Sequence, residues 1–147
     1  MKKRKGISLY ELLIVMSIIT LVAAISIPTI RNYLPSLQLS STVREVISKL
    51  REAQEEAVTT QVQHATRFNP ASNPVTIQVV KIGTPETVLQ TITLPKNISI
   101  TLDASFTSNQ VIFSADGGPN TSGNITITQD TSSKIINLSP AGMIKMQ

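Results

Sequence analysis

The pattern of apolar and polar positions divides the chain into three parts. Residues 12–27 carry no charge, and only three hydroxyl residues interrupt their apolar run. From Val43 to Ala57 the apolar side chains recur every three or four residues, as in an amphipathic helix. From His64 onward the period changes to two, which is typical of strands. These periods predict an α+β protein whose long N-terminal helix packs on a mainly antiparallel β-sheet domain.

The first part is long and apolar enough to cross a membrane. Counted from Ile7 to Ile27 it has 21 residues, and about 20 residues span a hydrocarbon layer of ~30 Å as a helix. Basic residues occupy positions 2–5, and basic residues flank the cytoplasmic side of membrane segments. We therefore expect a single-pass protein with a cytoplasmic N-terminus and an exported C-terminal domain.

Glu11 does not fit a plain membrane anchor. A carboxylate at the bilayer centre costs on the order of 2.5 to 3.5 kcal/mol and is retained where a partner offsets that cost. Cleavage between Gly6 and Ile7 would create an amine about one helical turn from Glu11. In a bundle of such helices, Glu11 of one subunit would pair with the amine of its neighbour. A secretory signal peptide has a shorter apolar core, and a generic anchor gives Gly6 and Glu11 no role.

The rest of the chain is predicted to continue the helix and then to form short strands. Pro28 and Pro35 can each bend a helix, so we expect a curved or locally melted helix around them. The helix should continue to about residue 63, with ion pairs between Glu45 and Lys49 and between Arg51 and Glu55 on its wet side. Alternation and turn residues predict eight strands, at 65–68, 75–82, 88–94, 98–102, 110–114, 125–128, 135–138 and 143–145.

The stretch GISLYELLIV, which begins at Gly6, follows a KKRK cluster and precedes an apolar helix with Pro28 at its end. It resembles the class III leader of type IV pilins and pseudopilins. The resemblance implies that a prepilin peptidase of the inner membrane cuts after Gly6 and methylates the new terminus at Ile7, and that Glu11 acts in assembly. It also implies that Pro28 kinks the helix, as Pro35 would, and that the partners are other pilin or pseudopilin subunits, an inner-membrane assembly platform and the lipid bilayer.

A second resemblance covers the C-terminal part. Residues 47–58, 113–117, 123–127 and 135–142 are similar to GspH/FimT-type minor pseudopilins, which share glycines before a strand and a final strand–turn–glycine unit. The implied protein is a minor subunit of a type II secretion pseudopilus or a type IV pilus-like filament, not an enzyme. A major structural pilin, or a pilus-tip module that binds DNA or an exoprotein, remains open as an alternative.

Together these patterns give a division of the chain. We expect a leader peptide at 1–6, a transmembrane and assembly helix at 7–28, an amphipathic second half of the helix at 29–63, and a β-rich exported domain at 64–147. The exported domain should lie outside the cytoplasmic membrane, in the periplasm or at the cell exterior.

Composition excludes several other functions. There is no cysteine, so neither disulfides nor thiolate metal sites are available. Apart from the basic cluster at 2–5, nine basic residues face nine acidic ones, and the only basic residues beyond position 110 are Lys134 and Lys145, so a nucleic acid partner is not expected. No motif links His64 to the acidic, nucleophilic or metal-binding residues that a catalytic triad or a zinc site needs. Asp116 and Gly117 predict a turn. No cofactor is expected.

Overall fold

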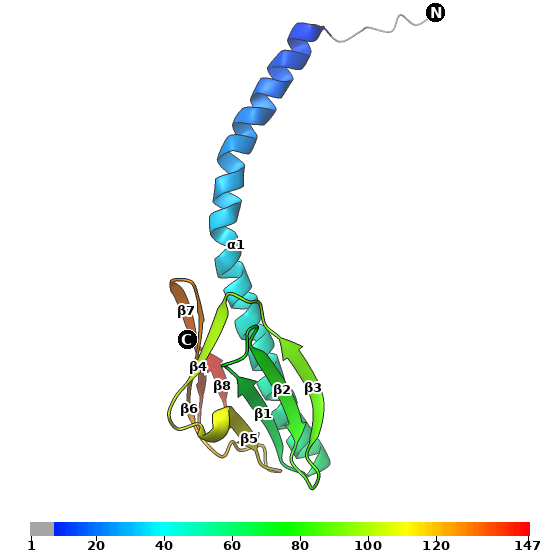
Figure 1. Cartoon of the computed structure of the whole chain (residues 1–147), viewed down its shortest axis with the longest axis vertical. Coiled ribbons are helices and arrows are strands. Elements are labelled where there is room, and N and C mark those ends of the chain that lie inside the picture. The colour runs from blue at the N-terminus through cyan, green and yellow to red at the C-terminus, as the bar shows by residue number, and fades with distance from the viewer. Residues whose placement is uncertain (1–7) are drawn as a thin grey trace, which may run out of the picture. The chain divides into compact units, whose positions relative to one another are not determined.

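The computed structural model describes residues 8–147 and consists of one long helix and two β-sheets (Figure 1). Helix α1 runs over Leu9–Thr60, three residues short of its expected end. The chain divides into two compact units, one ending at Pro35 and the other beginning at Ser36. The predicted α+β class, with a long N-terminal helix and antiparallel sheets, is confirmed.

All eight predicted strands are present, with ends shifted by at most three residues. They are β1 (His64–Asn69), β2 (Thr76–Lys81), β3 (Thr87–Thr93), β4 (Ile98–Leu102), β5 (Gln110–Phe113), β6 (Gly123–Gln129), β7 (Ser132–Leu138) and β8 (Ile144–Met146). A short 3-10 helix, η1 (Thr107–Asn109), precedes β5. Alternation of apolar and polar residues, together with the turn residues between the alternating runs, therefore located the strands.

The strands form two four-stranded antiparallel sheets. One has the order β3-β2-β1-β5 and the other the order β4-β6-β7-β8. The chain leaves the first sheet after β3, begins the second with β4, and returns to the first with β5, which pairs with β1. At the edge of the first sheet, a β-bulge shifts the register between β2 and β3 at Val79 and Val80.

The C-terminal part of α1 supplies one wall of the core. The predicted apolar stripe is buried at Val43, Val46, Leu50, Ala53 and Ala57, each fully inaccessible to solvent. These side chains form a single cluster with inward-facing residues of both sheets. Burial of this stripe against two sheets, more than helix propensity, holds this half of the helix in place.

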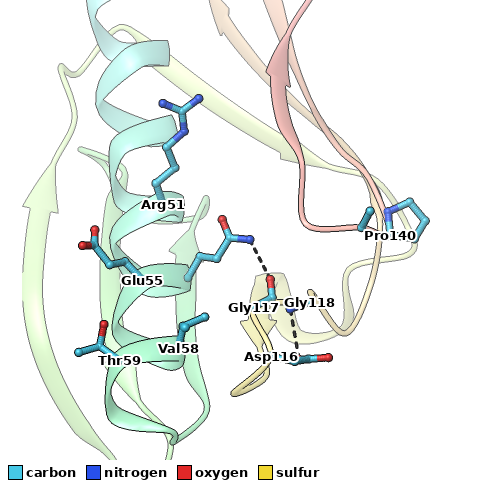
Figure 2. A pocket seen from close by; sticks show the side chains of 10 residues that line it. Arg51, Glu55, Val58, Thr59, Asp116, Gly117, Gly118 and Pro140 are labelled. Atoms are coloured by element: carbon cyan, nitrogen blue, oxygen red, sulfur yellow. Dashed lines mark hydrogen bonds between the residues drawn. The ribbon is translucent and has the colours of Figure 1, made fainter.

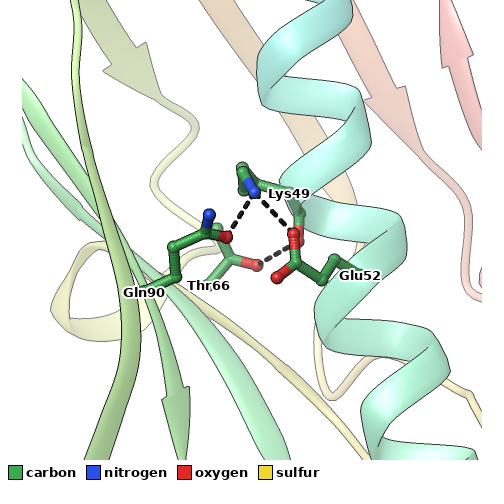
Figure 3. Close-up of polar contacts among 4 residues, drawn as sticks. All are labelled: Lys49, Glu52, Thr66 and Gln90. Carbon is green, nitrogen blue, oxygen red and sulfur yellow. Dashed lines mark hydrogen bonds and ion pairs between the residues drawn. The ribbon is translucent and has the colours of Figure 1, made fainter.

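The two predicted ion pairs of the helix are wrong. Lys49 instead pairs with Glu52, with 2.6 Å between Nζ and Oε2, and also donates to the side-chain oxygen of Gln90 on β3 (Figure 3). Thr66 on β1 donates from its hydroxyl to the Lys49 carbonyl at 3.4 Å. The sheet supplies an acceptor, the side-chain oxygen of Gln90, and the Lys49 amine binds this oxygen and Glu52 in place of Glu45.

Candidate assembly site

The described part of the helix begins with a capping arrangement around Glu11. Ser8 precedes the first helical residue, Leu9, and its carbonyl accepts the first helical hydrogen bond from Leu12 at 3.2 Å. The Glu11 carboxylate accepts from the backbone N–H of Ser8 at 3.4 Å. This is the reach-back half of a capping box, in which the residue at the third helical position satisfies the N-cap amide.

This capping role of Glu11 was not predicted from the sequence, although the pattern Ser8-x-x-Glu11 is typical of a capping box. The bond is long and the Glu11 side chain is exposed. The carboxylate therefore remains accessible to an external cation. Gly6 and Ile7, the residues of the expected cleavage and methylation, lie outside the described residues.

The helix beyond Glu11 presents apolar side chains on all of its faces. Every large apolar residue from Leu9 to Leu37 is exposed, from 43% at Ile14 to 79% at Leu9. By length and composition, α1 is a helix that can cross a membrane. A continuous apolar surface of this size needs lipid or other apolar helices around it, because water solvates it poorly.

The hydroxyl residues inside this segment are satisfied without an external partner. Ser17, Thr20, Ser26 and Thr29 each donate to the backbone carbonyl four residues earlier, at 2.7 to 3.0 Å. In a medium that offers no hydrogen bonds, an unpaired hydroxyl costs several kcal/mol, roughly 4 to 8 on a hydrocarbon scale. Bonding back to the helix removes most of that cost.

The prolines do not interrupt the helix. Both Pro28 and Pro35 lie inside the continuous span Leu9–Thr60, so of the two expected forms, a curved or a locally melted helix, local melting does not occur. Each proline still lacks the N–H that would bond to the preceding turn. The proposed kink at these positions therefore stays a prediction.

In the second unit, an open groove of about 700 Å³ runs beside the end of α1 (Figure 2). Its helix side carries Arg51, Glu55, Val58 and Thr59, and its other side is made by residues 116–118 and 140–141. The two carboxylates that line it, Glu55 and Asp116, outnumber its single cation, Arg51. Such a groove is not built to track phosphates, which need several clustered cations.

Gln54 also lines the groove. The Gln54 side-chain amide donates to the carbonyl of Gly117, at 2.8 Å, and to that of Gly142, at 3.1 Å. Gly117 and Gly142 both have positive φ, +81° and +78°. One helix side chain thus joins the loop after β5 to the loop before β8. Asp116 and Gly117 form the turn that the sequence predicted, with the Asp116 carboxylate accepting from the Gly118 N–H at 3.3 Å.

His64, which was considered for catalysis, lies buried at the start of β1. His64 is 1% exposed, and its Nδ1 donates to the Val62 carbonyl at 2.8 Å. Within residues 8–147, no group of three acidic, histidine or cysteine residues could hold a metal ion. These contacts assign His64 to the junction between helix and first strand.

A long N-terminal helix, apolar in its first half and docked on a sheet domain in its second, defines the type IV pilin and pseudopilin class. Residues 1–27 match the family described as Prokaryotic N-terminal methylation motif, and residues 42–142 match the family described as Type II transport protein GspH. The chain belongs to the GspH family of type II transport proteins. Members of this class are structural subunits and not enzymes.

Solved structures and curated relatives agree with this class. The minor pilin FimU of Pseudomonas aeruginosa has 15% identity and a TM-score of 0.66, covering 78% of this chain and 92% of its own. The minor pseudopilin EpsH of the Vibrio cholerae type 2 secretion system has 10% identity and a TM-score of 0.64, covering 75% and 96%. A fimbrial protein of Pseudomonas aeruginosa is 45% identical over 58 residues, which are 40% of this chain and 37% of that relative's length. At these identities the two structures establish the fold.

Proposed function

We propose that this chain is a minor subunit that is cut after Gly6, methylated on Ile7 and built into a pseudopilus or pilus through its N-terminal helix. The observation that carries the proposal is the combination of the methylation motif at residues 1–27 with an apolar helix surface exposed from Leu9 to Leu37. The precursor would sit in the inner membrane with its N-terminus in the cytoplasm. Its partners would be the prepilin peptidase, other pilin-type subunits and the inner-membrane assembly platform.

The mechanism of assembly follows from the cost of exposed apolar surface. Extraction from the bilayer exchanges lipid contacts for contacts with neighbouring apolar helices. In such a bundle Glu11 loses its access to water, and the new amine of a neighbouring Ile7 provides the charge that offsets its desolvation. Before assembly, Glu11 caps its own helix by accepting from Ser8.

Processing is tested at Gly6. A Gly6→Val variant expressed with the peptidase should remain at the precursor mass, since a bulky residue does not fit where a glycine is required at the cut. The native protein should show a single species that begins at methylated Ile7. A wild-type mass shift in the Gly6→Val variant would contradict the cleavage assignment.

Assembly is tested at Glu11. A Glu11→Val variant should insert and be cut, yet lose its crosslinks to other subunits, because the neighbour's amine has no counter-charge. Glu45→Val is the matched control, since Glu45 is an exposed carboxylate on the same helix but outside the apolar segment. Crosslinking of Glu11→Val at the wild-type level would reject the proposed pairing.

A further inference from the structure

The exposed aromatic residues of this protein are confined to the two ends of the apolar helix segment. The chain has two tyrosines, three phenylalanines and no tryptophan. The phenylalanines are all at most 5% exposed in the sheet domain, whereas Tyr10 and Tyr33 are 73% and 62% exposed on α1. An aromatic ring with a hydroxyl is suited to the boundary between hydrocarbon and water, where one part is apolar and the other is hydrated.

The spacing of the two tyrosines matches the thickness of a bilayer. They are 23 positions apart on a continuous helix, which corresponds to roughly 35 Å along the helix axis. With an average tilt of about 20°, the separation across the membrane falls to roughly 32 Å. The hydrocarbon core is ~30 Å thick and the headgroup layers extend it to about 40–45 Å. Each ring would therefore lie just outside the hydrocarbon.

The charged residues support the same position. Between the two tyrosines only Glu11 and Arg31 carry charge, and each lies within two residues of a tyrosine. The residues between them, from Leu12 to Ile30, are uncharged, and the hydroxyls among them bond back to the helix. A span from Leu12 to Ile30 places both charges at headgroup depth, where an ionised side chain costs far less than at the centre.

We propose that Tyr10 and Tyr33 are interfacial anchors that set the depth of the helix in the bilayer, with Leu12–Ile30 crossing the hydrocarbon. This rests on the proposed function, since it assumes that the precursor inserts. It differs from a span that begins at Ile7 and ends at Ile27, whose midpoint lies near residue 17. The anchored span has its midpoint near Leu21, a displacement of roughly 6 Å along the helix. It also explains how the uncut precursor tolerates Glu11.

The absence of tryptophan allows a direct measurement of depth. Single-tryptophan variants of the full chain, Met16→Trp, Leu21→Trp, Tyr10→Trp and Tyr33→Trp, would be reconstituted into vesicles of phosphatidylethanolamine and phosphatidylglycerol. Bromine would be placed on the acyl chains either close to the headgroup or close to the bilayer centre. Glu45→Trp, at an exposed position beyond the apolar segment, is the aqueous reference.

The expected result is strongest quenching by deep bromine for Leu21→Trp, more than for Met16→Trp, and preferential quenching by shallow bromine for Tyr10→Trp and Tyr33→Trp. In the Leu21→Trp background, Tyr33→Ala should lower the ratio of deep to shallow quenching, whereas the neighbouring exposed Leu34→Ala should not. Deeper quenching at Met16 than at Leu21, or a Tyr33→Trp signal as unquenched as the Glu45→Trp reference, would overturn the proposed depth. Failure of bromine to quench Met16→Trp and Leu21→Trp alike would instead refute insertion itself.

Discussion

Substitution of Gly142 by alanine tests whether the link made by Gln54 holds the sheet domain together. Gly142 has φ of +78°, and a Cβ at this position would lie 2.6 Å from the Gln54 side-chain nitrogen and 2.8 Å from the Gly117 carbonyl oxygen. A Cβ carbon cannot approach a non-bonded nitrogen or oxygen that closely, because it forms no hydrogen bond with them and overlaps their van der Waals radii. The substitution must therefore displace the Gln54 amide, the loop that carries Gly117, or both.

The loss in free energy of unfolding that we expect for Gly142→Ala has two contributions. A left-handed backbone conformation costs a residue with a Cβ about 1 to 2 kcal/mol. Displacing the Gln54 amide breaks its hydrogen bonds to Gly117 and Gly142, each with a net value of about 0.5 to 1.5 kcal/mol. The expected loss in free energy of unfolding is roughly 2 to 5 kcal/mol, a large share of the ~5 to 15 kcal/mol that stabilises a typical domain.

The assay is urea unfolding of a fragment of residues 36–147, which form a compact unit with their own core. Gly83→Ala is the control, because a Cβ at Gly83 meets its nearest neighbour at an ordinary 3.5 Å, and it should stay within about 1 kcal/mol of wild type. In a Gln54→Ala background the cost of Gly142→Ala should fall toward the backbone contribution alone, since the two residues share one interaction. Equal stability of the Gly142→Ala and Gly83→Ala fragments would refute the reasoning.

Three further substitutions in the same fragment separate strong contacts from weak ones. Leu50→Ala should cost about 2 to 5 kcal/mol because Leu50 is fully buried in the core cluster that α1 forms with both sheets; a loss below that range would mean that the core collapses around the cavity. Gln129→Leu should change the free energy of unfolding by less than about 1 kcal/mol. The buried Oε1 of Gln129 has no partner among the described residues, so the substitution removes only the hydrogen bond from Nε2 to the Gln38 side chain, at 2.9 Å. A loss of several kcal/mol would show that Oε1 does accept a hydrogen bond. Lys49→Met should cost no more than about 1 kcal/mol, as its partner Glu52 is 38% exposed and can be hydrated, and a larger loss would mark the pair as structural.

The local features of this protein were readable from the sequence because they depend on near neighbours along the chain. The spacing of Val43, Val46, Leu50 and Ala53 gave the buried face of the helix, since residues three and four apart share a face. Alternation gave all eight strands, and Asp116 with Gly117 gave the turn after β5. The charge-free run beside Glu11 and the residues around Gly6 gave the apolar helix and the pilin class, and the family matches bear out the class.

Contacts between distant segments were not readable in the same way. Nothing near Lys49 in the sequence shows that β3 brings Gln90 within reach, so the helix spacing alone suggested Glu45 as its partner. The pairing of β5 with β1 likewise was not predicted, because it depends on how the two sheets pack against the same helix. Nothing around Gln54 in the sequence shows that its side-chain amide reaches the carbonyls of Gly117 and Gly142.

By itself, the sequence determined the class of protein, the apolar segment around Glu11, and which residues of each element are apolar, because periodicity and charge act locally. The tertiary structure alone decided how the strands divide between two sheets and why Gly117 and Gly142 are glycines. Both outcomes depend on contacts between segments far apart in the chain, such as the hydrogen bonds of the Gln54 amide to carbonyls 63 and 88 positions further along, and no local pattern encodes which distant carbonyl a side chain will reach.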